Sequence, residues 1–416
     1  MLALTITVSA ASAHAQLRVP GLDLPLPQRI GPLDTGILRD PAERLLSDRT
    51  VPDVRGLRLG EITRRLRQHR DVLEADPRGE PVVRREILAW SPNAASLAAA
   101  KAAGLGIARE RRLEGLDETL VTFQVPDGSD TATALELLRQ HDPEGTYDFN
   151  HVYTGSAAAP MPPATPARQH GRAAPGTVSV GLVDGGVDTA HPVFADTPVR
   201  RWGCDEVAHP NPHGTAVAAL MVGKSADFRG VAPGASLFAA DIYCDSGSGG
   251  SAERIAGALA WLARQQVGVI NMSIVGPANL ALERAVGAMI RRGHLLVAAA
   301  GNDGPAAPPL YPASYPGVVG VGAVDKRGRV LPEAARGPQV MFSAPGSNMV
   351  SASPGSPPYR QVRGTSFAAP IVAAMLAAAL PAPDKVAAAD ALVALAKRAS
   401  NGIVGMDFRT DPSALK

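Results

Sequence analysis

Four polar residues of this chain could together form the machinery of a nucleophilic serine. Ser366 stands between Gly364 and an apolar run, 371–380, that predicts a buried helix. A serine at the N-terminus of a helix lies where backbone N–H groups favour developing negative charge. Such a nucleophile also needs a base, an acid that orients the base, and an oxyanion donor. A candidate for each of these three lies upstream of Ser366.

The orienting acid is predicted to be Asp184. It ends the apolar and β-branched run 178–183, which predicts a strand covered on both faces. The base is predicted to be His213, at the start of a run of small apolar residues that ends at Gly223 as a helix does. The oxyanion donor is predicted to be Asn302, which follows another apolar run and precedes a glycine-rich turn.

Each of these residues also has a simpler interpretation. Asp184 could be an ordinary residue of a turn, His213 could have no role, and Ser366 could be the N-cap of its helix. The complete set of nucleophile, base, orienting acid and oxyanion donor favours catalysis over these separate interpretations.

Taken in chain order, these residues resemble the Asp, His, Asn and Ser blocks of the subtilisin-like serine peptidases, the subtilases. The resemblance extends from about Thr177 to Leu380. It implies a serine endopeptidase that hydrolyses peptide bonds in proteins through an acyl-enzyme on Ser366. It also implies which residues bind an extended polypeptide substrate: Ser273, Ile274, Val275 and Gly276 along its backbone, and Leu310 in the first specificity pocket.

The sequence departs from the family pattern in three places. Gly185 replaces the hydroxyl residue that usually follows the catalytic Asp, which removes one hydrogen bond to that carboxylate. Val275 replaces a common glycine beside the substrate backbone. The connection 220–230 is short, and its side-chain oxygens on Ser225 and Asp227 are too few for a six-ligand calcium site. We therefore expect no calcium at that position, and neither a cofactor nor a catalytic metal.

Other chemistries find less support. His209 and His213 are four residues apart, but two intervening prolines prevent the helix that a zinc pair would need. The chain contains neither a Gly-x-Ser-x-Gly elbow nor a phosphate-binding glycine loop. Two alternatives remain open within the family: a catalytically silent subtilase that acts as a binding module, and a subtilase that performs transpeptidation.

The elements that must position these residues alternate between strands and helices from 178 to 380. This alternation predicts an α/β fold, with a parallel sheet covered by helices on both faces, as in subtilisin-like proteins. Ligands of such sheets bind beyond the carboxyl ends of the strands, where Asp184, Ser273 and Asn302 are expected.

The sequence upstream predicts a second folded part. From 82 to 153 the pattern is strand, helix, strand, strand, helix, strand, which is the ferredoxin-like order shared by subtilase propeptides. This part is predicted to be an inhibitory propeptide-type domain and a partner of the catalytic part; the alternative is an accessory domain that is never removed. The predicted organisation is therefore 1–15 signal-peptide-like segment, 16–80 proline-rich lead-in with a charged, solvated helix at 57–73, 81–153 propeptide-like domain, 154–176 linker, and 177–416 catalytic domain.

Composition favours an exported protein. Residues 1–13 are apolar and small, and Ala13-His14-Ala15 fits a signal-peptidase site, although a positively charged start is missing. Cys204 and Cys244 could pair in an oxidising compartment or remain thiols. A net charge of +2 and an aromatic content of 4% argue against nucleic acid as a partner, and no apolar stretch is long enough to span a membrane.

Overall fold

The computed structural model describes residues 18–19, 22–23, 54–155 and 178–405 of the 416-residue chain. Contacts divide the chain into a first unit, 1–50, and a second unit, 51–416. In the first unit, β1 (Arg18–Val19) pairs antiparallel with β2 (Leu22–Asp23). The signal-like segment and most of the proline-rich lead-in lie outside the described residues.

A seven-stranded sheet forms the centre of the part predicted to be catalytic, 177–416, and all of its neighbouring strands are parallel. This confirms the predicted α/β class. In spatial order the strands are β10 (Val199–Trp202), β11 (Ser236–Asp241), β9 (Ser179–Asp184), β12 (Val269–Met272), β14 (Leu295–Ala299), β15 (Val319–Val324) and β16 (Val340–Pro345).

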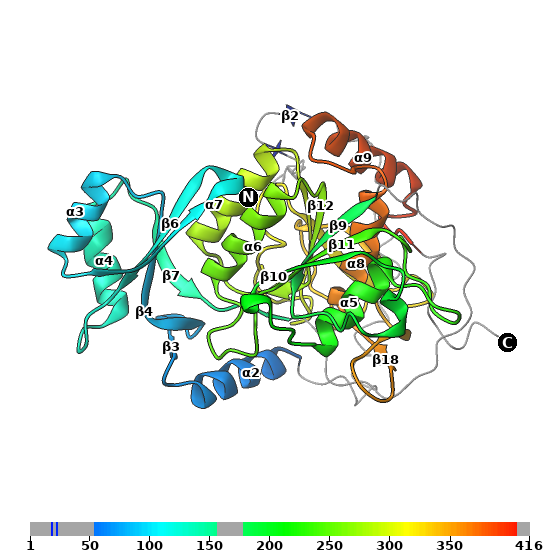
Figure 1. The fold of residues 1–416 in the computed structure, drawn as a ribbon, viewed down its shortest axis with the longest axis horizontal. Helices are drawn as coiled ribbons and strands as arrows, with labels where there is room; N and C mark the ends of the chain where they lie inside the picture. The colour runs from blue at the N-terminus through cyan, green and yellow to red at the C-terminus, as the bar shows by residue number, and fades with distance from the viewer. Residues whose placement is uncertain (1–17, 20–21, 24–53, 156–177, 406–416) are drawn as a thin grey trace, which may run out of the picture. The chain divides into compact units, whose positions relative to one another are not determined.

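Helices cover both faces of this sheet (Figure 1). Side chains alternate along β9, so Val180 and Leu182 join one apolar cluster while Val183 joins the other. The first cluster contains α5 (Pro212–Val222), α8 (Thr365–Ala377) and α9 (Lys385–Arg398), and the second contains α6 (Ala252–Arg264) and α7 (Leu280–Arg291).

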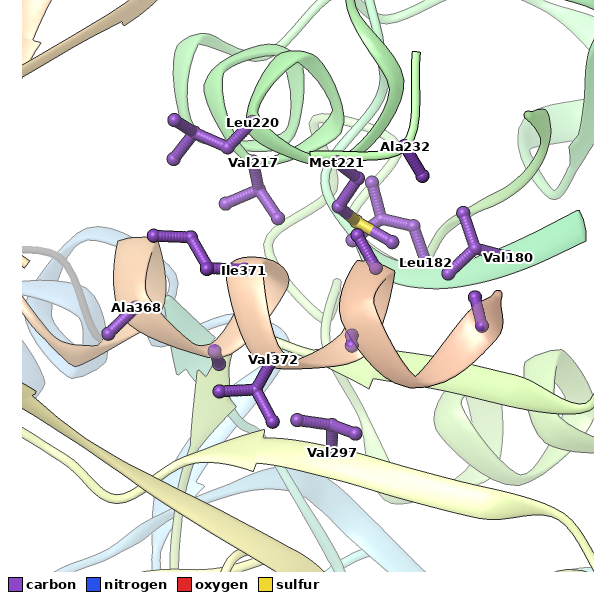
Figure 2. Close-up of a cluster of buried hydrophobic side chains, with 14 of the residues drawn as sticks. Val180, Leu182, Val217, Leu220, Met221, Ala232, Val297, Ala368, Ile371 and Val372 are labelled. Carbon is purple, nitrogen blue, oxygen red and sulfur yellow. The ribbon is translucent and has the colours of Figure 1, made fainter. Parts of the chain in front are cut away.

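The apolar contacts between α5, α8 and the sheet fix the helices on which His213 and Ser366 lie. Figure 2 shows Val217, Leu220 and Met221 of α5 beside Ile371 of α8, with Val297 of β14 below. All five side chains are fully buried. Rigid packing of this kind holds the N-termini of the two helices in a fixed relation.

The propeptide-like part has the predicted ferredoxin-like order. Strands β7 (Tyr147–His151), β4 (Pro81–Trp90), β6 (Glu118–Gln124) and β5 (Gly106–Leu113) form an antiparallel sheet in that spatial order, and α3 (Ala94–Ala102) and α4 (Thr131–His141) connect them. A short strand that the sequence did not predict, β3 (Leu73–Ala75), also pairs with β4.

This small sheet shares an apolar cluster with α6 and α7. Leu113, Leu116 and Leu120 are buried in the same cluster as Ile255 and Leu259 of α6. The close approach requires the 3₁₀ turn η2 (Glu114–Leu116), whose Gly115 has no room for a side chain against the backbone of α6. The two parts therefore pack with a continuous apolar interior.

Two predicted segments differ in detail from the structure. The charged helix expected at 57–73 is α2 (Val54–Gln68), and it ends earlier because the chain turns before entering β3. The expected linker 154–176 begins with an ordered strand, β8 (Thr154–Gly155), and its remaining residues lie outside the described part. Among the described residues, no helix has both the length and the apolar character to cross a membrane.

Candidate active site

The carboxylate of Asp184 and the imidazole of His213 meet at the carboxyl edge of the sheet. Asp184 ends β9 and is 1% exposed, and His213 lies in the first turn of α5. Nδ1 of His213 lies 2.8 Å from Oδ1 of Asp184. An ionised carboxylate can only accept, so Nδ1 carries the proton and Nε2 keeps its lone pair. Within the described part of the chain, Nε2 has no hydrogen-bond partner.

Asn211 positions the start of α5 and fills the space beside Gly185. Its Oδ1 accepts a hydrogen bond from the backbone N–H of His213 at 2.8 Å, as an N-cap does. A Cβ on Gly185 would lie 2.7 Å from Cγ of Asn211, so no side chain fits there. Oδ1 of Asp184 accepts from the N–H of Gly185 at 2.6 Å, while Oδ2 lacks a partner among the described residues. The missing hydroxyl at position 185 thus has the effect that the sequence predicted.

Ser366 is the second residue of α8, and Gly364 takes the N-cap position. The simpler interpretation of Ser366 as the N-cap is therefore wrong. Phe367, which follows it, packs against the His213 ring with the ring centroids 5.4 Å apart. Ser366 is fully buried, and its Oγ donates to the carbonyl of Ser273 at 3.3 Å. The hydroxyl must rotate away from this carbonyl before it can donate to Nε2 of His213.

Ser273 compensates for a proline inside α8. Pro370 has no N–H, so it cannot donate to the carbonyl of Ser366 four residues earlier. The hydroxyl of Ser273 donates to that carbonyl instead, at 2.8 Å, and receives a hydrogen bond from Nδ2 of Asn271 at 2.9 Å. These two hydrogen bonds connect the first turn of α8 to the end of β12.

The side-chain amide of Asn302 is oriented by the residue before the serine. The backbone N–H of Thr365 donates to Oδ1 of Asn302 at 3.0 Å, which identifies Nδ2 as the donor end of that amide. Gly364 has φ 125°, and a Cβ there would lie 2.9 Å from Nδ2 of Asn302. Sequence reasoning missed Thr365, because a backbone donor has no signature in the residue type.

The strand assigned to substrate is occupied by another part of the same chain. β13 (Ile274–Val275) pairs antiparallel with β8, with Ile274 opposite Gly155 and Val275 opposite Thr154. A Cβ on Gly155 would lie 3.7 Å from the imidazole of His213. The segment that leaves the propeptide-like part thus reaches the Asp184–His213 pair.

Tyr153 anchors this segment directly before β8. Its N–H donates to the carbonyl of Gly250 at 2.8 Å, and its hydroxyl donates to the carbonyl of Pro277 at 2.8 Å. The Tyr153 side chain is fully buried and packs against Gly276. Burial raises the pKa of its phenol. Gly276 also exchanges two backbone hydrogen bonds with Tyr311, of 2.9 and 3.0 Å.

Leu310 lies near the predicted oxyanion donor. It is 4% exposed, and its Cδ1 packs against Gly301, which precedes Asn302. The next residue, Tyr311, is the one bonded to Gly276. The structure therefore brings Leu310 between the strand assigned to substrate and the turn that carries Asn302.

A disulfide lies near the end of β11, the strand that pairs with β9. Cys204 and Cys244 are joined with an S–S distance of 2.06 Å, which settles the open question of their pairing. Asp241 lies beside them and stands opposite Asp184 in the register of β11 and β9. Burial raises the pKa of Asp241, although the N–H groups of Tyr243 and Cys244 oppose the shift.

Candidate metal ligands are few in the part of the chain that the structure describes. One group of three occurs there, Cys204, Asp241 and Cys244, and its two thiols are consumed by the disulfide. In the short connection 220–230, the hydroxyl of Ser225 accepts from the N–H of Phe228 and contacts the hydroxyl of Tyr359. His209 lies outside α5 and contacts Asp245, with Nδ1 3.1 Å from Oδ2.

Comparison with known proteins identifies relatives of this chain. Residues 176–409 match the sequence model of the Subtilase family. M-protease of Shouchella clausii is 35% identical over 274 residues, which are 62% of this chain and 69% of that protein. Subtilisin E of Bacillus subtilis is 35% identical over 208 residues, and the chain covers 53% of its length.

The fold also matches a solved structure. Fervidolysin of Fervidobacterium pennivorans, described as a keratinolytic enzyme related to subtilisin, superimposes with a TM-score of 0.65 and 22% identity over 80% of this chain and 62% of that one. At this identity the match concerns the fold alone. The family match covers more than half of the chain and includes every strand of the seven-stranded sheet; the chain belongs to the subtilase family.

Proposed function

We propose that the chain is a serine endopeptidase that hydrolyses peptide bonds in proteins through an acyl-enzyme on Ser366. The observation that carries the proposal is the hydrogen bond between Nδ1 of His213 and the buried carboxylate of Asp184. It leaves Nε2 of His213 as a base, and Phe367, the residue after Ser366, packs against the same imidazole. Relatives named as proteases and subtilisins at 35% identity support the same chemistry.

Each residue then has a defined role in the reaction. Nε2 of His213 accepts the proton of the Ser366 hydroxyl as Oγ attacks the peptide carbonyl, and Asp184 stabilises the imidazolium that forms. Nδ2 of Asn302 donates to the oxyanion, and its position is fixed in advance by the N–H of Thr365. His213 returns the proton to the leaving amine. Water then attacks the acyl-enzyme, with His213 again acting as the base.

The substrate binds as an extended strand beside β13. Its backbone pairs with Ile274 and Val275, and Ser273 and Gly276 border the paired segment. The antiparallel pairing of β8 with β13 supports this binding mode, because β8 is a polypeptide in the conformation that a substrate would adopt. Unfolded or loop segments of proteins can take this conformation, whereas residues inside a helix cannot.

The propeptide-like part, 81–153, acts as an inhibitor of the catalytic part, 177–416. Two observations support this role: the shared apolar cluster, and the β8 strand that occupies the proposed substrate position. The Cys204–Cys244 disulfide supports export to an oxidising compartment.

Covalent labelling tests the proposed function. After release of the propeptide-like part, a fluorophosphonate is expected to react with one residue, Ser366, which mass spectrometry of the tryptic peptides would locate. A protein that stays unlabelled would be a binding module instead. Mass analysis of the products from a model peptide, with and without an added amine, separates hydrolysis from transpeptidation.

The first specificity pocket is expected to prefer small or medium apolar side chains. Leu310 occupies volume near Asn302 that a smaller residue would leave open. Replacing Leu310 with glycine should therefore increase kcat/KM for peptides with Phe before the cut bond by roughly tenfold relative to peptides with Ala. A peptide library measures both values. A wild-type preference for Arg, Lys or Phe would contradict the assignment of Leu310 to this pocket.

A further inference from the structure

Helix α2 contacts both of the loops that flank the proposed active site. Near its C-terminal end, Nη2 of Arg65 donates to the carbonyl of Gly249 at 2.7 Å. Gly249 adjoins Gly250, whose carbonyl binds the N–H of Tyr153 at the start of the inhibitory segment. Near the other end of α2, Nε of Arg58 lies 3.5 Å from Oδ2 of Asp303. The sequence predicted only a solvated helix here.

Arg58 joins three separate parts of the chain. Its Nη1 and Nη2 donate to the two carboxylate oxygens of Glu80, at 3.1 and 2.9 Å, just before β4. Its Nε lies 3.5 Å from Oδ2 of Asp303, which directly follows Asn302; this contact is an ion pair, and Nε has no hydrogen-bond partner among the described residues. The side chains of Arg58, Glu80 and Asp303 are 15, 19 and 13% exposed. Because water is largely excluded and one arginine faces two carboxylates, this network is stronger than an ordinary surface ion pair.

The C-terminal end of α2 fits closely against the other loop. A Cβ on Gly247 would lie 2.7 Å from Nδ1 of His69 and 2.9 Å from Cγ2 of Val72, so only glycine allows this approach. Arg65 is half-buried here, and burial lowers the pKa of its guanidinium. The contact involves residues of the propeptide side, α2 and the turn after it, against backbone of the catalytic part.

We propose that Gly247, Gly249 and Asp303 form a docking surface for α2, and that α2 is a second inhibitory contact that holds β8 in the active site. The surface offers a carbonyl oxygen and a carboxylate, and a helix that presents donor groups such as guanidiniums on one face fits it. Arg58 and Arg65 are seven residues apart and lie on the same face of α2. The inhibitory role rests on the proposed peptidase function.

Access to Ser366 in the full-length chain tests this proposal. The variant Arg58→Ala/Arg65→Ala should react with a fluorophosphonate about tenfold faster than wild type or more, since one charge-assisted hydrogen bond and one partly buried ion pair to the catalytic part are lost. The control is Arg64→Ala/Arg67→Ala, which removes the same charge from the exposed side of the same helix. This control should react within about twofold of wild type. Equal labelling rates in the two double variants would overturn the docking proposal.

A second measurement does not depend on catalysis. In the Ser366→Ala protein, hydrogen exchange of the amides in 246–250 should become faster when Arg65 is also replaced by alanine, because the Gly249 carbonyl loses its donor. The Arg67→Ala change should leave the exchange of these amides unaltered. Unchanged exchange in the Arg65 variant would also contradict the proposal. Failure of the peptidase function gives a different result: no labelling of any variant, even after removal of the N-terminal segment.

Discussion

Replacing Ser366 with alanine is expected to lower kcat for peptide hydrolysis about a millionfold, the loss known for a subtilisin that lacks its serine. The reason is that the variant lacks the hydroxyl on which the acyl-enzyme is proposed to form. The fold should remain, because the hydrogen bond from Oγ of Ser366 to the carbonyl of Ser273 is long, at 3.3 Å. Its loss should cost about 1 kcal/mol of stability. Steady-state kinetics and circular dichroism measure the two effects separately.

Two companion variants give this experiment its controls. His213→Ala should lose as much activity as Ser366→Ala, and the double variant should lose no more, because the two side chains act as one proton-transfer unit. Asn302→Ala should retain measurable hydrolysis, with kcat lower by about 10²–10³-fold, since it removes one oxyanion donor. Substantial hydrolysis by the Ser366→Ala protein would refute the catalytic assignment.

The sequence predicted the elements whose pattern is set by burial. The run of Val and Leu before Asp184 and the small apolar residues after His213 face only protein, so their composition alone indicates a covered strand and a buried helix. Each of the four residues proposed for catalysis lies at or near an end of such an element. Their placement at the carboxyl edge was therefore predictable once the sheet was known to be parallel.

The sequence patterns did not predict two elements that are partly exposed. The strand β10, Val199–Trp202, has two exposed arginines at the edge of the sheet, and the last helix, α9, has exposed Val386 and Val393 on a surface of alanines. Neither pattern has the apolar period that marks a covered element. Contacts between distant segments were not predicted either. The pairing of β8 with β13 and the ion pairs of Arg58 depend on three-dimensional proximity, which no local sequence pattern encodes.

Maturation should depend completely on Ser366. We expect wild-type protein to be cut close to Gly155, because β8 pairs with the proposed substrate strand β13 and a Cβ on Gly155 would lie 3.7 Å from the His213 imidazole. The Ser366→Ala protein should accumulate uncut. Intact mass and N-terminal sequencing of both purified proteins measure this directly. The predicted linker extends to residue 176, so cleavage could also occur well after Gly155. A cut there would lie outside the segment that pairs with β13.

The cut fragment should remain bound to the catalytic part. Leu113, Leu116 and Leu120 share an apolar cluster with α6, and exposing them would cost roughly 2 kcal/mol each. Gel filtration after cleavage should therefore show one species that contains both fragments, with peptidase activity appearing only when the smaller one dissociates or is degraded. A Ser366→Ala sample that is processed normally would identify another protease as the agent. An uncut wild-type protein with full activity would make 81–153 a permanent accessory domain.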